Sequence, residues 1–599
     1  MTKHSHRLLP MMLAGVATVA FAVPAFAQNA APAAPAAPAP VAQLPPANYT
    51  LSVSNDRLLN ADNEPQNWLT SNQNLKSWRY SGLTQINRTN VANLKMVWAM
   101  SLGGANDVVG NNGPNVMSNP LVDNGFLYAN SEWGRTFKID VRNPKRGDLL
   151  WVNDPAIIHT GNSSLTRGIA MYGNAIINAT QDGRVVSINR DNGELIWDQQ
   201  VAVTNEWGSR ERFNSQPLTV EGKAIVQNGA GDGGANGWVA AIDLTNGREL
   251  WRWEVIPRPG QPGAETWKDI GNNAWQHGGG GLWTVGSYDK DTRSYVTGTG
   301  NPVPQYDVEF RPGDNLYTDA AVALDIDTGK LKWYFQYTPQ DGWDYDENGI
   351  HLIYDIPVDG TMRHIVGHFG RNGFYYNLDG RSGAFINAGL YANEMNWTKG
   401  IDPKTGKPVE YQPGLAVQTY IPATRTLRGD PAERVCPTWH GGLAHQPPAF
   451  NPVKRMVYSV GTEGCYTQNG GTGVNATTGA MVGRTFNSDL YYGGITAVDV
   501  VTNKVVSKVS VPVEIRSGVL ATAGGLIFTT LTDGEFVAYN DDTLEEVFSF
   551  NVGTPLKAGP MTFAVNNKQY IAFQTSGLHV HPIRFTDLMH SSYLFVFGL

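Results

Sequence analysis

One phrase recurs along this chain and limits its fold more than any other feature. Each copy has an apolar residue followed by Asp or Asn, then a turn with Asn or Gly, then an apolar strand that often ends in Trp. The clearest copies are residues 187–197, 241–251 and 323–333. Their β-branched and aromatic flanks, joined by short turns, predict a hairpin in each copy. Copies that lie tens of residues apart indicate one small structural unit per repeat.

The number of copies predicts how the hairpins assemble. Looser copies lie at residues 138–151, 376–385, 497–505 and 538–548, and Trp98 ends a first copy. Long helical periodicity is scarce, and radial stacking of four-stranded sheets hides their edges. Seven or eight copies therefore predict an all-β chain, a β-propeller with that many blades whose repeat Trp residues pack between blades. We expect the tail, residues 593–597, to complete a blade begun near the N-terminus.

The N-terminus has the pattern of an export signal. Basic residues precede an apolar run at 8–23, and small residues two apart follow at 25–27. The alternative is a membrane-spanning helix, but the run is short and is broken by Pro10 and Pro24. The pattern therefore predicts a signal peptide over residues 1–27 and a periplasmic protein.

The rest of the chain divides at a change in composition. Residues 28–47 are almost all Ala and Pro, which predicts a disordered linker. Residues 48–599 then form the propeller domain. No later segment reaches the length of apolar sequence that a span requires, so we expect no membrane span. A net charge of −8 gives no support for a nucleic-acid partner.

Three segments carry a specific resemblance. They are Gly298-Thr299-Gly300-Asn301-Pro302, then Arg311-Pro312-Gly313-Asp314-Asn315, then Thr338 to Asp346. In this order and spacing they closely resemble the quinoprotein alcohol dehydrogenases, periplasmic propellers that use pyrroloquinoline quinone (PQQ) and a metal ion. The resemblance covers about residues 65–599. It implies an eight-bladed β-propeller with tryptophan-docking repeats.

The resemblance implies a metal site built from oxygen ligands, which a hard cation requires. Asn301 and Asp344 match family ligands, and Asp344 also matches the base that takes the alcohol proton, with a pKa lowered by the cation. Asp346 resembles the extra Asp of members that use a lanthanide; the alternative is an Asp in a surface turn. Asp232 falls where the family has a Glu ligand; the alternative is a Gly-rich turn. We expect Ca²⁺ or a lanthanide ion.

The cofactor has three carboxylates and a flat ring system, so its site needs cations and a stacking face. The resemblance places Trp283 under the quinone, Arg167 on a carboxylate and Arg371 on the quinone oxygens. Asn214 and Arg516 complete the expected cofactor-binding set. Arg516 stands where the family often has a Trp.

Departures from the family pattern concern the rim of the site. The adjacent Cys pair that covers PQQ is replaced by Gly161-Asn162-Ser163-Ser164, a family Glu by Met117 and a family Asn by Ala444. Loss of bulky lining predicts a roomier or more polar pocket. We therefore expect a larger or secondary alcohol as substrate in place of methanol.

The two Cys residues have one expected role. Cys436 and Cys465 resemble a family pair, and export places them where a disulfide can form. A zinc site with His440 and His445 is the alternative, although the spacing fits no common zinc pattern. The chain lacks Cys-x-x-Cys-His, so electrons must pass to a separate acceptor, which we expect to be a soluble cytochrome c.

Two functional classes remain at this stage, beside a third interpretation as a PQQ-dependent aldose or sugar dehydrogenase, for which a different propeller would be expected. The first is a PQQ-dependent alcohol dehydrogenase that transfers a hydride from an alcohol to metal-bound PQQ. A homodimer is compatible with this class. The second is a non-catalytic periplasmic propeller scaffold of envelope assembly. A scaffold would have no reason to keep Asn301, Asp344, Asp346 and Arg371 at family spacing.

Overall fold

Strands dominate the computed structural model of this chain, as the repeat predicts. The structure describes residues 52–104, 115–157, 165–425, 427, 432–469, 473–474, 481–482, 485–575 and 591–599. The predicted signal peptide and linker lie outside these residues. The described α-helix is the short α1 (Asn55–Leu59), and seven 3₁₀ turns accompany it. The all-β prediction is therefore confirmed. None of the described helices is long and apolar enough to span a membrane.

Eight sheets of four or five strands form from the described residues. Three sheets come first in the chain: β3 (Leu121–Asp123), β4 (Phe126–Asn130), β5 (Thr136–Asp140) and β6 (Asp148–Asn153); β7 (Ala170–Tyr172), β8 (Ala175–Ala179), β9 (Arg184–Asn189) and β10 (Leu195–Gln200); β11 (Leu218–Val220), β12 (Lys223–Gln227), β13 (Trp238–Asp243) and β14 (Glu249–Glu254). Two more follow: β15 (Ser287–Asp289), β16 (Ser294–Gly298), β17 (Ala320–Asp325) and β18 (Leu331–Gln336); β19 (His351–Val358), β20 (Thr361–Phe369), β21 (Phe374–Asp379) and β22 (Phe385–Leu390).

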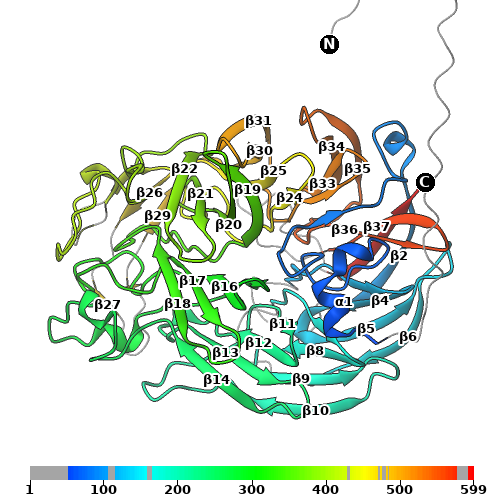
Figure 1. Cartoon of the computed structure of the whole chain (residues 1–599), viewed down its shortest axis with the longest axis horizontal. Coiled ribbons are helices and arrows are strands. Elements are labelled where there is room, and N and C mark those ends of the chain that lie inside the picture. The colour runs from blue at the N-terminus through cyan, green and yellow to red at the C-terminus, as the bar shows by residue number, and fades with distance from the viewer. Residues whose placement is uncertain are drawn as a thin grey trace, which may run out of the picture. The chain divides into compact units, whose positions relative to one another are not determined.

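The C-terminal part supplies the remaining sheets. They are β24 (Ala449–Asn451), β25 (Met456–Glu463), β30 (Tyr492–Asp499) and β31 (Lys504–Val511); β1 (Tyr80–Ser81) with β32 (Leu520–Thr522), β33 (Leu526–Thr530), β34 (Glu535–Asn540) and β35 (Glu546–Asn551); and β2 (Lys95–Gly104) with β38 (Ser591–Gly598), β37 (Lys568–Gln574) and β36 (Met561–Val565). Smaller sheets join β23 (Ala432–Val435), β26 (Tyr466–Asn469) and β29 (Thr485–Ser488), and β27 (Gly473–Val474) with β28 (Met481–Val482). Within residues 43–599, Figure 1 shows the sheets following one another in chain order and returning to β2.

The last described strand closes a sheet that an early strand begins. β2 pairs antiparallel with β38, with Lys95 opposite Gly598 and Trp98 opposite Val596. The prediction that residues 593–597 complete a blade begun near the N-terminus is therefore confirmed. The number of blades stays a prediction.

The repeat Trp residues join neighbouring sheets. Each indole N–H donates to a backbone oxygen in the next sheet's turn: Trp151 to Arg190 at 3.3 Å, Trp197 to Leu244 at 3.1 Å, Trp251 to Ile326 at 3.0 Å and Trp333 to Gly380 at 3.1 Å. Gly329 shows why the same turn needs glycine, because its φ is +69° and an added Cβ would lie 2.4 Å from the ring of Trp251. The predicted docking of the repeat Trp between sheets is confirmed for these four residues.

The inner and outer strands differ in burial. All but the last residue of β17 is buried, whereas β18 alternates between buried and more exposed residues. The outer strand therefore has one face on its neighbour and one face on solvent. The residues of the candidate site come from the loops between strands: Asn301 follows β16, and Asp344 and Asp346 lie between β18 and β19.

Candidate active site

The acidic segment, residues 341–347, lies in the loop between β18 and β19 and begins with a tight turn. The carboxylate of Asp341 accepts the backbone N–H groups of Trp343, Asp344 and Tyr345, each at 3.0 Å. Asp344 has a φ of 70°, a conformation that costs energy for a residue other than Gly. Asp341 is fully buried, and burial raises its pKa to about 6. Asp341 therefore stabilises the backbone conformation that presents Asp344.

The Asp344 side chain lies at the floor of the site. It is 9% exposed, and the Tyr306 hydroxyl donates to its Oδ2 at 2.9 Å. Burial raises the pKa of Asp344 well above its usual range, and Asp232 and Asp346 add to the effect while Arg371 opposes it. The lowered pKa expected beside a metal cation stays a prediction.

Asp346 is buried beside Asp344, so the alternative of an Asp in a surface turn is wrong. Its Oδ1 accepts the backbone N–H of Asn301 at 2.9 Å, and its Oδ2 forms an ion pair with Arg371. Burial also raises the pKa of Asp346, with Arg371 opposing. Glu347, the next residue, is fully buried and lies 2.8 Å from Nε2 of His368.

Asn301 and Asp232 come from two glycine-rich loops. Asn301 follows β16, and its carbonyl oxygen accepts the N–H of Gly280 at 2.9 Å. Asp232 lies in the 3₁₀ turn Gly231–Gly233 and accepts from Gln305 Nε2 at 3.1 Å. An added Cβ on Gly231 would lie 2.5 Å from the nitrogen of Gly281, so glycine is needed where the Asp232 loop packs on the segment Gly280-Gly281 that bonds to Asn301. The loops thus bring Asp232 and Asn301 to the same region.

Trp283 lies between two guanidinium groups. The Cζ atoms of Arg167 and Arg371 are 4.8 Å and 6.0 Å from its ring centroid. Arg167 donates from Nη1 to the backbone oxygen of Asn214 at 2.9 Å. Burial lowers the pKa of Arg167 to about 9, a value that leaves it charged at neutral pH. Arg167 and Arg371 thus lie near the predicted stacking residue, and Asn214 bonds to Arg167.

A second wall carries basic and imidazole groups. The Arg516 guanidinium lies 2.7 Å from the Glu514 carboxylate and 2.6 Å from Nδ1 of His440. Burial opposes ionisation of Glu514, but Arg516 and His440 hold its pKa at about 2. Burial lowers the pKa of His440 to about 3, and its ring is neutral. His445 lies near Trp283, with 5.8 Å between the ring centroids.

One cavity of about 330 Å³ unites most of these side chains. Its lining includes Met117, Arg167, Arg212, Asn214, Asp232, Trp283, Asp344, Asp346, Arg371, Trp439, His440, His445, Arg516 and Lys557. The structure therefore brings together every predicted cofactor-binding residue and three of the four predicted metal ligands. Asn301 lies behind the wall, bonded to Asp346. Met117 lines the cavity where the resemblance predicted an opened rim, whereas Gly161 to Ser164 lie outside the described residues.

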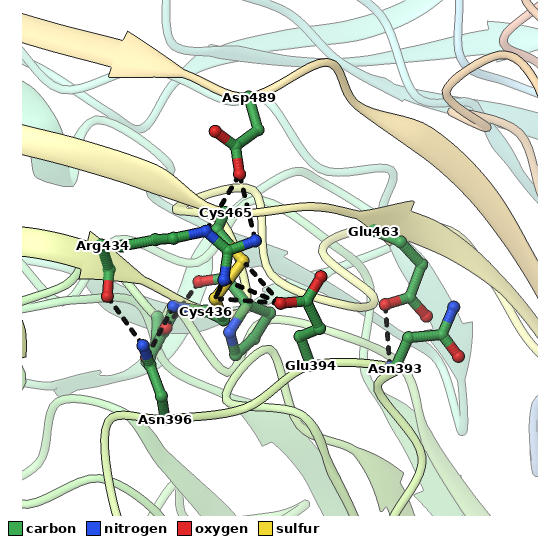
Figure 2. Close-up of a disulfide and its surroundings, with 10 residues drawn as sticks. Asn393, Glu394, Asn396, Arg434, Cys436, Glu463, Cys465 and Asp489 are labelled. Carbon is green, nitrogen blue, oxygen red and sulfur yellow. Dashed lines mark hydrogen bonds and ion pairs between the residues drawn. A yellow bond between two sulfur atoms is a disulfide. The ribbon is translucent and has the colours of Figure 1, made fainter.

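Cys436 and Cys465 form the predicted disulfide, so the zinc alternative is wrong. Figure 2 shows Glu394, Arg434 and Asn396 around it. The backbone N–H of Cys436 donates to Asn396 Oδ1 at 2.8 Å, and Arg434 pairs with Glu394 at 2.7 Å.

The residue after each Cys contacts the acidic segment. The Tyr345 hydroxyl donates to the Pro437 oxygen at 2.7 Å, and the Tyr466 hydroxyl donates to the Trp343 oxygen at 3.2 Å. The disulfide therefore ties together two backbone segments that hold Asp344 from either side.

Sequence reasoning missed three residues of this site. Tyr306 lies five residues after Asn301, between two segments that carried the resemblance, so its position was a usable signal. Asp341 lies inside the segment Thr338 to Asp346, but its burial and its three backbone contacts had no signal in the sequence. Lys557 stands alone in an apolar stretch, which was the only mark of its burial.

Known proteins resemble this chain over most of its length. The model of a protein family described as "PQQ: Glucose/ethanol/alcohol dehydrogenase, beta-propeller domain" matches residues 68–388. The quinoprotein alcohol dehydrogenase PedH of Pseudomonas putida is 30% identical, with 87% of this chain and 88% of the relative covered. The lanthanide-dependent methanol dehydrogenase of Methylacidiphilum fumariolicum is also 30% identical, with 87% of each chain covered.

Solved structures of proteins with related names also resemble this chain. A europium-containing methanol dehydrogenase superposes with a TM-score of 0.81 at 28% identity, covering 91% of this chain and all of that one. The quinohemoprotein alcohol dehydrogenase of Comamonas testosteroni also gives 0.81 at 28% identity, covering 91% of this chain and 82% of that one. These likenesses confirm the β-propeller fold predicted from the repeat.

Proposed function

Because the chain belongs to the PQQ-dependent alcohol dehydrogenase family, we propose that it oxidises a larger or secondary alcohol to the carbonyl compound and passes the electrons to a soluble cytochrome c in the periplasm. The observation that carries the proposal is one cavity that holds Asp344, Asp346, Arg371 and Trp283 together. PQQ, when bound, supplies the acceptor for a hydride.

The acidic side of the cavity fits a hard cation. Asp344 and Asp346 are buried, the more exposed Asp232 lines the same cavity, and Arg371 forms an ion pair with Asp346. Carboxylates crowded in this way favour an added positive charge, and oxygen donors suit Ca²⁺ or a lanthanide. Asp344, Asp346, Asn301 and Asp232 would hold the ion. The buried extra carboxylate of Asp346 favours a trivalent ion.

The basic side fits a flat polyanion. Arg371 is buried and Arg167 is half-buried, and the buried Nε atom of each lacks a hydrogen-bond partner among the described residues. Buried donors without partners are costly unless a ligand completes them. Arg167 and Arg371 would bind cofactor oxygens beside Trp283, with Asn214 and Arg516 at the edges.

Asp344 is the group that would accept the hydroxyl proton of the alcohol. Tyr306 orients its Oδ2, and Asp341 orients its backbone. The proton would move to a carboxylate oxygen of Asp344 as the hydride leaves the carbinol carbon. This division leaves Arg371 and Asp346 to set the electrostatic environment of the base.

The lining supports a substrate other than methanol. Met117 and Arg516 line the cavity at positions where the family pattern has a Glu and a Trp. The scaffold alternative is disfavoured, because the relatives are named as dehydrogenases and a scaffold needs no cavity that gathers these charges.

The test is reconstitution of the purified mature chain with PQQ and either Ca²⁺ or La³⁺, followed by dye reduction with methanol, ethanol, secondary alcohols and polyols. We expect turnover with larger or secondary alcohols, and none for Asp344→Asn, which should still bind PQQ. A clear preference for methanol would contradict the substrate proposal. No PQQ binding and no dye reduction with either metal would favour the scaffold.

Partner and location need separate measurements. Reduction of a purified soluble cytochrome c by the reconstituted enzyme tests the proposed acceptor. Fractionation of cells that produce the full chain tests export, since release with the periplasmic fraction after loss of residues 1–27 is expected. Light scattering of the mature protein tests the proposed homodimer.

A further inference from the structure

Lys557 is a buried cation without an anion. It lies between β35 and β36, is 2% exposed and lines the cavity of the candidate site. Its Nζ has no hydrogen-bond partner within the described part of the chain. An ammonium group buried in this way is destabilising unless a counter-charge reaches it.

The charged neighbours do not supply that counter-charge. Glu514 is the nearby carboxylate that attracts Lys557, while Arg516 repels it. The contacts of Glu514 with Arg516 at 2.7 Å, His440 Nδ1 at 3.0 Å and the Thr462 hydroxyl at 3.1 Å all fall on its Oε1 atom, and Lys557 Nζ makes no hydrogen bond to either carboxylate oxygen within the described residues. Burial and Arg516 lower the pKa of Lys557 to about 7. Burial is the main cause that lowers the pKa of His445, and Lys557 adds to this effect.

We propose that Lys557 is the receptor for a carboxylate of a molecule bound in this cavity, an inference that rests on the function proposed above. A carboxylate beside Nζ would complete the hydrogen bonding of the ammonium group and supply its counter-charge. Two sources have the same chemistry: a carboxylate of PQQ, or the carboxylate of a hydroxy-acid substrate. The experiment separates them.

The variant is Lys557→Met, which keeps the length of the side chain and removes its charge. Its control is Lys568→Met in β37, an exposed position. The first measurement is the Kd of PQQ for the metal-loaded protein, determined from the quenching of Trp fluorescence as PQQ is added. The second compares the KM for γ-hydroxybutyrate with the KM for butanediol bearing two terminal hydroxyls, because these substrates differ in one carboxylate.

If PQQ supplies the carboxylate, Lys557→Met weakens PQQ binding by about tenfold or more and changes both KM values alike. If the substrate supplies it, PQQ binding is kept and only the KM for γ-hydroxybutyrate rises, by about tenfold. Unchanged PQQ affinity together with an unchanged KM ratio overturns the inference. Wild-type protein that binds PQQ but oxidises no alcohol refutes the proposed function, and the PQQ affinity of Lys557→Met then decides the role of Lys557.

The pH dependence of the free energy of unfolding shows whether the charge of Lys557 serves only to stabilise the fold. The folded pKa of Lys557, about 7, is below the unfolded value of about 10.4, so the unfolded chain binds more protons between these values. Stability of the wild-type apoprotein should therefore rise with pH from about 7 to about 10, and this increment should be absent in Lys557→Met. The variant should be no less stable than wild type at about pH 6, whereas a structural lysine would make it less stable. PQQ binding at about pH 8 should take up one proton more in wild type than in the variant if PQQ is the source.

Discussion

Arg371 and Asp346 form an ion pair inside the candidate site. The resemblance assigned these two residues to different ligands, Arg371 to the quinone and Asp346 to the metal. The backbone N–H of Arg371 also donates to Oε2 of Glu347 at 3.1 Å, so both partners are held by the same turn. The two predicted subsites are therefore electrostatically coupled, and a change at Asp346 alters the field at both.

Asp346→Asn should lower La³⁺-dependent turnover by about tenfold or more and Ca²⁺-dependent turnover by less, because the trivalent ion depends more on the lost charge. The amide oxygen of Asn can still accept the N–H of Asn301. Turnover is measured at saturating alcohol after reconstitution with each metal. Asp359→Asn, in an exposed turn, is the matched control. Equal losses with both metals would refute a role of Asp346 in metal selectivity.

Removal of the disulfide by Cys436→Ser with Cys465→Ser should lower the free energy of unfolding by about 2–4 kcal/mol. It should also lower turnover, because Pro437 and Tyr466 would no longer hold the backbone of residues 343–345 in place. Urea unfolding and dye reduction measure the two effects, with reductant-treated wild type as a second form of the same change. Full activity in the reduced protein would show that the disulfide acts on stability alone.

The fold was predictable because a repeated unit leaves the same local signals many times. The docking of Trp251 and its partner Gly329 follows from one turn pattern that recurs along the chain. The site residues were predictable only through resemblance, since Asp232 and Asp344 are far apart in sequence and meet only when the sheets assemble. The roles of Asp341 and Lys557 were out of reach, because they depend on burial and on contacts between loops of different sheets.

Gly329→Ala should lower the free energy of unfolding by more than Gly360→Ala. Both positions have a positive φ, +69° and +78°, so both pay a similar backbone cost of about 1 kcal/mol. An added Cβ at Gly329 would also overlap the ring of Trp251 at 2.4 Å, whereas at Gly360 it would meet nothing within 4 Å. Overpacking should add about 1–3 kcal/mol at Gly329. Equal losses in urea unfolding would show that the Trp does not restrain the turn.

His364 should make stability depend on pH through its contacts between two sheets. Its Nε2 lies 2.9 Å from Asp289 of β15, and its Nδ1 lies 2.9 Å from Asp355 of β19. Hydrogen bonding to Asp289 is the main cause that raises the pKa of His364 to about 9. The unfolded value is about 6.5, so this stabilisation is complete below about pH 6.5 and is lost as the pH rises to about 9. The Tm difference between wild type and His364→Asn, measured by calorimetry, should therefore be larger at about pH 6 than at about pH 9.5. A difference that does not change with pH would mean that His364 is uncharged and acts only by packing.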